Sequence, residues 1–156
     1  MAVRNILTDE DPLLRKKSRE ISEMTPRIET LVEDMLDTLY ETGNGIGLAA
    51  PQVGVLRRVF VIDLQEDENS EPLVFINPEI YETDGSQVNQ EGCLSVPGRW
   101  GEVERPAHLR VRALDAKGEP FDMEAKGLLA TCICHENDHL DGILFTDKVI
   151  GELDEA

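Results

Sequence analysis

"GLLATCICHENDHLDG", residues 127–142, is the stretch that decides the fold of this chain. Its first half is apolar on nearly every side, which is typical of a helix buried in the middle of a domain. Gly142 is a stop signal for that helix. The second half carries His135, Glu136 and His139, which have the H-E-x-x-H spacing of a metal-binding helix.

The two histidines of this stretch have the spacing of metal ligands. Positions four apart on a helix lie one above the other, so His135 and His139 can each point an imidazole nitrogen at one ion. Glu136 lies at the edge of the same face, where it can take a proton from a bound water without binding the metal. The alternative is a pair of hydrogen-bonded core histidines, and the buried setting of the helix favours the metal.

A catalytic metal needs a third protein ligand and an open position. Six residues after His139, where one class of metallopeptidase has a further histidine, this chain has Phe145. The only later glutamates, Glu152 and Glu155, lie in what we expect to be a tail. The third ligand is therefore expected upstream of the helix.

The cysteines next to the histidines are poor candidates for that ligand. Cys132 shares a helix face with His135 but lies about 10.5 Å along the helix axis from His139. Cys134 is rotated away from the histidine face. We predict that both are small core residues.

Cys93, in "QEGCLSVPG", is open to three interpretations on spacing alone. It can be a metal ligand, a nucleophile paired with a histidine, or an inert buried thiol. We expect a very short strand here, followed by a turn at Pro97 and Gly98. His108, a single histidine in a predicted strand, is expected to have an ordinary surface or hydrogen-bonded role.

Helical signals precede the strands. Asp11 and Pro12 can cap a short helix, and Thr25 and Pro26 begin a longer one whose apolar residues recur every three or four positions. Gly43 ends it. Its acidic residues are predicted to form a solvated outer face: Glu29, Glu33, Asp34 and Asp37.

Strand-like segments follow from residue 57 onward, separated by turn signals: "RRVFVIDL", "LVFINPEIY", "HLRVRALD" and "EPFDMEA". With the helices they predict a single α+β domain over residues 1–156. Mostly antiparallel strands pack around the central buried helix, with helices at the N-terminus.

The composition limits the classes of function. The formal charge of −17 repels nucleic acid and anionic membranes, so we expect neither as a direct partner. No segment has the length of a membrane span or the pattern of a secretion signal. The chain has 3 cysteines, which favours reduced thiols and a cytoplasmic protein.

Three segments together resemble the motifs of peptide deformylases, in the same order: "GIGLAAPQ" at residues 45–52, "EGCLS" at 91–95 and "HENDH" at 135–139. Similar segments between them extend the resemblance over nearly the whole chain, to about Phe145. On spacing alone the glycines of the first motif fit a tight turn or a close approach of a substrate strand.

The resemblance assigns roles to particular residues. Cys93, His135 and His139 match the three metal ligands, and Glu136 matches the catalytic acid and base. The side-chain amide of Gln52 and the backbone N–H of Leu94 match the donors that stabilise the oxyanion. Residues that match the substrate-binding groove or lie behind it are Ile46, Gly47, Glu91, Leu128, Thr131 and Cys132, with Arg105 as a suggested partner of Glu91 and Asn89 at the rim.

The resemblance also implies the reaction. Hydroxide formed at the metal attacks the formyl carbon of an N-formylmethionyl peptide, Glu136 moves the proton, and formate is released. One thiolate and two imidazoles suit zinc or iron, and general affinity trends favour zinc. The family instead implies Fe(II) as the working metal, with Zn(II) or Ni(II) able to occupy the site.

Some positions depart from the family pattern. Cys134 stands where glutamine is usual, from which we expect altered helix packing, and Thr131 and Asn89 are more polar than the usual aliphatic residues of the methionine pocket. The sequence ends at "GELDEA" without a further helix, as in phage-type members. From the missing helix and the formal charge of −17 we expect only weak or transient association with the ribosome. A monomer is the default expectation, and if a phage encodes the chain, the cytoplasm is that of the host.

Two other functions compete with this one. A metallopeptidase would cut internal peptide bonds with the same chemistry, and the absent downstream ligand and the "EGCLS" segment speak against it. A silent binding module would hold a structural metal through four protein ligands, and Glu136 and Gln52 would have no purpose in it.

Overall fold

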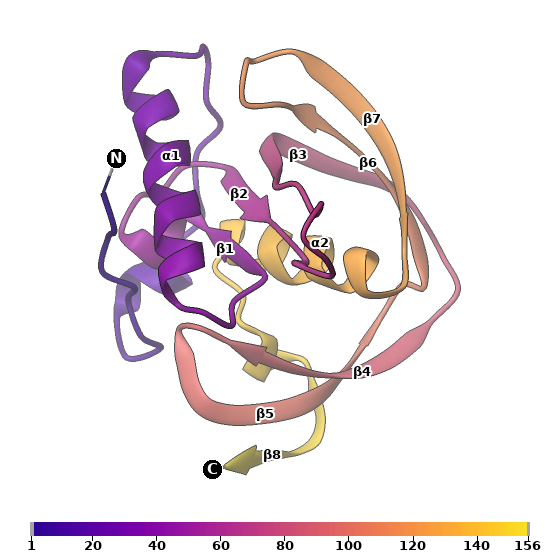
Figure 1. Ribbon diagram of the computed structural model, residues 1–156. Helices are drawn as coiled ribbons and strands as arrows, with labels where there is room; N and C mark the ends of the chain where they lie inside the picture. Colours follow the sequence, from indigo (N-terminus) through magenta and orange to yellow (C-terminus); the bar gives the residue numbers. More distant parts are fainter. Residues whose placement is uncertain (1, 156) are drawn as a thin grey trace.

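The structure is a computed structural model that describes residues 2–155 and consists of two antiparallel sheets and two α-helices (Figure 1). The helices are α1 (Pro26–Glu41) and α2 (Gly127–Leu140). The first sheet has the order β1-β2-β3-β6-β7 and the second the order β4-β5-β8. The strands are β1 (Gly47–Ala49), β2 (Val59–Ile62), β3 (Leu73–Asp84), β4 (Gln87–Cys93), β5 (Val96–Arg105), β6 (His108–Leu114), β7 (Pro120–Lys126) and β8 (Val149–Glu155). Short 3-10 helices are η1 (Pro12–Arg15), η2 (Ala50–Val53) and η3 (Phe145–Asp147).

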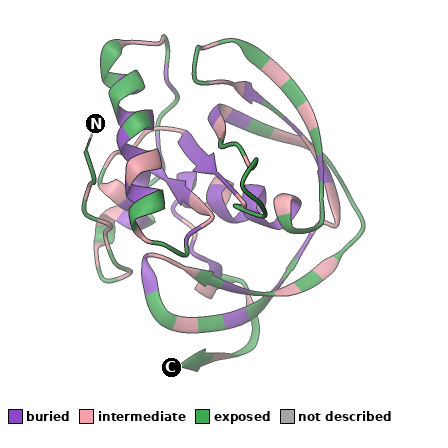
Figure 2. Cartoon of the chain, in the orientation of Figure 1, coloured by how far each residue is buried: buried purple, intermediate pink, exposed green. Residues whose placement is uncertain are grey.

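Helix α2 lies at the centre of the molecule, where it packs on β1, β2 and β7. Its residues Ala130, Ile133 and Leu140 are fully buried among the inner side chains of the five-stranded sheet. Phe60 and Phe75 stack in that core with ring centroids 4.8 Å apart. Figure 2 shows α2 buried along most of its length. The predicted α+β fold around a central buried helix is confirmed.

Helix α1 begins and ends where its sequence signals lie. The hydroxyl of Thr25 caps the helix by accepting a hydrogen bond from the Ile28 N–H, and Pro26 occupies the first turn. Its apolar stripe, including Met35 and Leu39, packs on buried residues of β2 such as Val61. The opposite side of α1 is exposed in Figure 2, as expected of an amphipathic helix at the surface.

Two predictions about the chain around the second sheet were wrong. The turn after Cys93 consists of Leu94 and Ser95, and Pro97 and Gly98 lie within β5 instead. The pairing register shifts beside Cys93, and this irregular part of β5 accommodates the proline and the glycine. The expected C-terminal tail is the strand β8, which pairs with β5. Its alternation is weak in the sequence because most of its residues are exposed.

One acidic residue of α1 does not belong to the predicted solvated face. Asp34 is only 5% exposed and accepts hydrogen bonds from the Ala2 N–H and the Arg4 guanidinium at 2.8 and 2.9 Å. The Arg4 N–H also donates to Thr38 one turn further on, so the N-terminal segment runs along α1 and covers this carboxylate. The hydrogen bond from Arg4 is the main reason that the pKa of Asp34 is lower than its ordinary value.

The Asp34→Asn variant should lose stability in a pH-dependent way. Since the folded state lowers this pKa, the stabilising effect is present above the ordinary value of 3.8 and is lost as the pH falls further. At pH 7 we expect the free energy of unfolding to drop by about 1 kcal/mol, the scale of one hydrogen bond, and the difference to shrink below pH 4. Urea denaturation across pH measures this, with Glu33→Gln as the exposed control on the same helix. A constant difference at all pH values would contradict it.

Gly142 ends α2 at a point where the chain passes close to the N-terminal segment. Its φ is +77°, and a Cβ atom here would lie 2.4 Å from the Arg15 carbonyl oxygen. The Ser18 N–H also donates to the Leu140 carbonyl, which fixes that segment on the end of α2. The glycine is needed both for its conformation and for the close approach.

Comparing Gly142→Ala with Gly54→Ala separates the cost of a positive φ from the cost of the close approach to Arg15. Both glycines have positive φ, but nothing lies within 4 Å of a Cβ at Gly54. We expect Gly54→Ala to cost about 1–2 kcal/mol of unfolding free energy and Gly142→Ala about 3 kcal/mol or more, because backbone must move. Equal costs in urea denaturation would show that the close approach to Arg15 is unimportant.

Candidate metal centre

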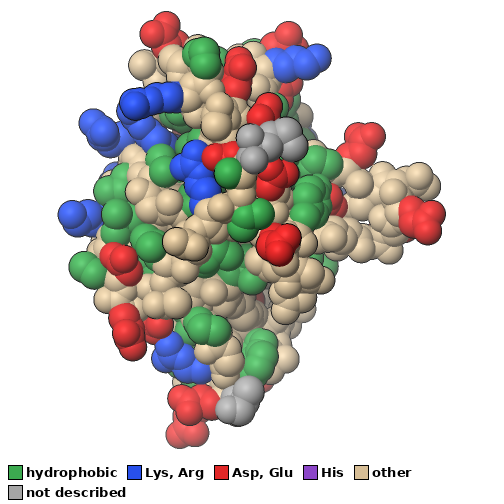
Figure 3. All heavy atoms as spheres, turned by 60° about the vertical axis from the view of Figure 1, so that its left-hand side comes forward, with side chains coloured by type: hydrophobic (Ala, Val, Ile, Leu, Met, Phe, Trp, Pro, Cys, Tyr) green, Lys and Arg blue, Asp and Glu red, His purple; other side chains and the backbone are tan. Residues whose placement is uncertain are grey.

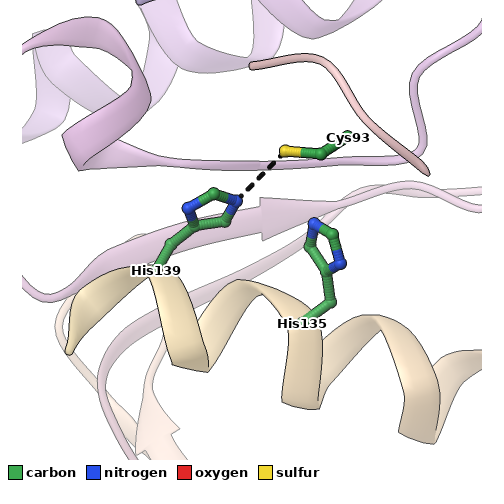
Figure 4. Close-up of side chains that lie close together, drawn as sticks. All are labelled: Cys93, His135 and His139. Carbon is green, nitrogen blue, oxygen red and sulfur yellow. Dashed lines mark hydrogen bonds between the residues drawn. The ribbon is translucent and has the colours of Figure 1, made fainter. Parts of the chain in front are cut away.

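Three side chains that can bind a metal meet between β4 and α2. Cys93 ends β4, and His135 and His139 point toward it from successive turns of α2 (Figure 4). Their ligand atoms all lie within 4.8 Å of one another, and Cys93 Sγ is 3.3 Å from His139 Nε2. Both histidines are buried. The structure thus brings together the three residues proposed as ligands.

A buried ion pair sets the orientation of His135. Its Nδ1 lies 2.9 Å from Glu91 Oε1, and Arg105 donates to both oxygens of the same carboxylate at 2.9 Å. Burial alone would raise the pKa of Glu91, but the hydrogen bonds from Arg105 and His135 outweigh it and lower the pKa to about 2. Because the ionised carboxylate only accepts, Nδ1 of His135 carries the hydrogen and Nε2 is left for a metal.

The other two cysteines are unsuited to metal binding. Burial raises the pKa of the Cys132 thiol to about 12 and that of the Cys134 thiol to about 11, so both stay protonated near neutral pH. Both thiols lie in the core cluster around α2. In contrast, burial lowers the pKa of His139, which favours the neutral imidazole that a metal ligand requires.

Glu136 is a buried carboxylate beside the three ligands. Its Oε1 is buried and accepts no hydrogen bond from residues 2–155, and burial raises its pKa to about 7. A carboxylate with that pKa can both accept and release a proton near neutral pH. A Cβ at Gly47 would lie 2.6 Å from Glu136 Oε2, so the glycine leaves room for this side chain. That contact was not predicted from the sequence.

The amide of Gln52 is held in one orientation at the same site. Its Oε1 accepts from the Ala49 N–H at 2.9 Å, so its Nε2 faces Ser95 Oγ at 3.0 Å and Cys93 Sγ at 3.6 Å. Ser95 is fully buried and was not singled out from the sequence. Leu94 lies between it and Cys93 in the turn from β4 to β5. The NH₂ group of Gln52 and the turn at Leu94 and Ser95 therefore both lie next to Cys93.

A pocket of about 460 Å³ opens onto this cluster. It lies between β1 and β4, each the edge strand of its sheet. Apart from His139, its lining includes every residue predicted to be catalytic, metal-binding or substrate-binding, together with Asn89: Ile46, Gly47, Gln52, Asn89, Glu91, Cys93, Leu94, Leu128, Thr131, Cys132, His135 and Glu136. His139 completes the ligand cluster from behind. Trp100, the chain's one tryptophan, also lines the pocket and was missed, because a lone aromatic in a strand carries no sequence signal.

The structure also shows the surroundings of Glu91 and His108. Glu91 lines the pocket, but its oxygens are occupied by Arg105 and His135, which makes it a positioning residue. His108 lies on β6, where its Nε2 is 2.9 Å from Glu124 on the neighbouring strand, a hydrogen-bonded role as expected.

The residues present fit a single metal ion with an open position. One thiol and two imidazoles converge, and a buried carboxylate with an unpartnered oxygen lies on the pocket side of them. Three protein ligands with a pocket at the fourth position are typical of catalytic sites, whereas structural sites have four protein ligands.

The chain is similar to known proteins over nearly its whole length. The family model for polypeptide deformylase matches residues 3–154. A peptide deformylase from Lachnoclostridium phytofermentans is 56% identical over 156 residues, which cover 100% of this chain and 94% of that protein. The crystal structure of a peptide deformylase from Legionella pneumophila matches with a TM-score of 0.90 and 44% identity, covering 95% of this chain and 86% of that one. A probable peptide deformylase from Synechococcus phage S-SSM7 matches with a TM-score of 0.88 and 37% identity, covering 93% and 99%.

Metal binding should depend on Cys93 and not on the neighbouring cysteines. We expect the purified apoprotein to bind one Zn(II) or Co(II) per chain. Cys93→Ala should weaken binding by more than about 100-fold, because losing even a hydrogen-bonding partner of a metal ligand costs about 10–100-fold. Cys134→Ala, the matched control, should keep the affinity because its protonated thiol lies in the core. Calorimetric titration of the apoprotein with Zn(II) measures both affinities, and the Co(II)–thiolate absorption band of the wild-type protein should be absent in Cys93→Ala and kept in Cys134→Ala. Unchanged binding by Cys93→Ala would exclude it as a ligand.

Proposed function

The chain belongs to the polypeptide deformylase family, and from this we propose that it removes the formyl group from the N-formylmethionyl end of newly made polypeptides and releases formate. The observation that carries the proposal is the buried Glu136 carboxylate, with one oxygen free, beside Cys93, His135 and His139 at the pocket. The family is metal-dependent, and this cluster is the candidate metal site.

The pocket suits an extended peptide. Edge strands present backbone N–H and C=O groups that can pair with an added strand. Here the edge strand β1 borders the pocket with Gly47, and the segment before it adds Ile46. We propose that these two residues hold the substrate backbone while its formyl end reaches the cluster. The side chain of the first residue then faces Leu128, Thr131 and Cys132 on α2.

The chemistry assigns a role to each polar group. A divalent cation held by Cys93, His135 and His139 would act as a Lewis acid and make a water acidic, with a pKa of about 7 in the zinc case. Glu136 takes a proton from the attacking water and later gives it to the leaving amine.

The oxyanion that forms on the formyl group needs donors at fixed positions. We propose the Gln52 amide, whose orientation is fixed by Ala49 and Ser95, and the Leu94 N–H in the adjoining turn. One such donor is worth about 2.7–4 kcal/mol in the transition state.

The finer properties are proposals of the same kind. We propose Fe(II) as the physiological metal, on the family resemblance, with Zn(II) or Ni(II) as possible occupants of the same donor set. We further propose a monomer that works in the cytoplasm and meets the ribosome only weakly. On the face drawn in Figure 3 the Lys and Arg side chains gather mainly toward the left edge and acidic ones are scattered over it. The formal charge of −17 supports weak attraction to RNA. None of the helices in residues 2–155 is long and apolar enough to cross a membrane.

Formate release from formyl-Met-Ala-Ser by anaerobically iron- or nickel-loaded protein tests the function. Glu136→Gln should keep its metal and lose turnover by about 10²–10⁴-fold, the usual contribution of a positioned acid and base. Glu29→Gln, on the exposed face of α1, is the control and should keep full activity.

The outcome also separates the competing functions. Cleavage of casein without release of formate would favour a metallopeptidase, and a metal with four protein ligands and no turnover would favour a structural site. Full activity in Glu136→Gln would contradict the proposed mechanism, even if the protein released formate from formyl-Met-Ala-Ser.

A further inference from the structure

A chain of hydrogen bonds runs along one wall of the pocket. Gln87 Nε2 donates to the carbonyls of Pro106 and Gly127 at 3.0 and 2.8 Å. Asn89 Nδ2 in turn donates to Gln87 Oε1 at 3.1 Å and to Thr131 Oγ1 at 3.4 Å. Both Asn89 and Thr131 line the pocket that opens onto the metal ligands.

The direction of these bonds is fixed by the two carbonyls. A carbonyl only accepts, so the NH₂ group of Gln87 must face Pro106 and Gly127, and its oxygen must face Asn89. The NH₂ group of Asn89 therefore faces Gln87 and Thr131. Thr131 Oγ1 accepts in this chain, which leaves its hydroxyl hydrogen as a donor.

That hydrogen has no acceptor within residues 2–155. Threonines in helices often donate to a carbonyl one turn back, as Thr38 does to Asp34 at 2.7 Å and Thr42 to Leu39 at 2.6 Å. Thr131 makes no such bond among the described residues, and the carbonyl one turn before it, that of Gly127, accepts from Gln87 instead. The side chain of Thr131 thus offers a donor, and the unused oxygen of Asn89 an acceptor, at a wall that is otherwise made of Leu128 and Cys132.

Asn89 and Thr131 lie where the first side chain of a bound formyl peptide would be. Thr131 lies one helical turn before His135 on the same face of α2. In a formyl peptide only the amide nitrogen and the α-carbon separate the reacting carbon from that side chain. A peptide with its formyl group at the cluster therefore places its first side chain against this wall.

Resting on the proposed function, we propose that Asn89 and Thr131 form a polar subsite that admits a first side chain with an acceptor oxygen, so that formyl-methionine sulfoxide is deformylated as well as formyl-methionine. The Thr131 hydroxyl donates to the sulfoxide oxygen. Oxidation makes methionine polar, which an entirely aliphatic wall would exclude.

The test compares kcat/KM for three peptides that differ only in the first side chain: formyl-Met-Ala-Ser, its methionine sulfoxide form and its norleucine form. Norleucine is the apolar control of similar length. In the metal-loaded enzyme, Thr131→Val should lower the sulfoxide-to-norleucine ratio of kcat/KM by about three- to tenfold, the factor of one neutral hydrogen bond. Thr131→Ser, which keeps the hydroxyl group, should have the wild-type ratio. Asn89→Leu alone should lower the ratio.

Thr83→Val, a threonine on the exposed part of β3, is the matched control and should leave the ratio unchanged. An unchanged ratio in both Thr131→Val and Asn89→Leu, with formyl-Met-Ala-Ser still cleaved, would overturn the subsite alone. Absence of formate from all three peptides with the wild-type enzyme would overturn the proposed function and the subsite with it.

Discussion

The buried carboxylate of Glu91 is the group on which the rest of the site depends. It joins three elements, because it lies on β4, accepts from Arg105 of β5 and faces His135 of α2. Arg105 also donates to Asp138 at 2.7 Å, one turn after the first histidine. Removing one partner of a buried ion pair costs about 3–5 kcal/mol, since the remaining charge is left unpaired. The ion pair thus fixes the second sheet against α2 and at the same time sets the direction of His135, a candidate metal ligand.

The pocket follows from how two sheets end around one helix. The edge strands β1 and β4 do not pair with each other, and α2 lies behind the space between them. Residues of all three elements therefore line one volume, with β1 contributing Gly47. Small residues are needed where the elements come closest, as at Gly47 against the carboxylate of Glu136. The arrangement buries the Glu136 carboxylate enough to raise its pKa to about 7, although the residue lines the pocket.

The sequence predicted the features that local signals determine, and it failed where distant segments meet. The spacing of His135 and His139 and the cap at Thr25 are local, so the helices and two of the candidate ligands could be predicted. Spacing alone left Cys93 with three interpretations, because only the fold brings β4 next to α2; the family resemblance was needed to choose. The burial of Asp34 under the N-terminal segment and the pairing of β8 with β5 are tertiary contacts with no local signal. The free hydroxyl hydrogen of Thr131 likewise depends on Gln87, on another element.

In the proposed site, Cys93, His135 and His139 hold one metal ion and leave a position open to the substrate. X-ray absorption spectroscopy of the zinc-loaded protein tests it most directly. We predict one sulfur at about 2.3 Å and two imidazole nitrogens at about 2.0–2.1 Å, with one further oxygen ligand that exchanges when a metal-binding hydroxamate is added. Two sulfur ligands, or four protein ligands that the hydroxamate does not change, would contradict the account.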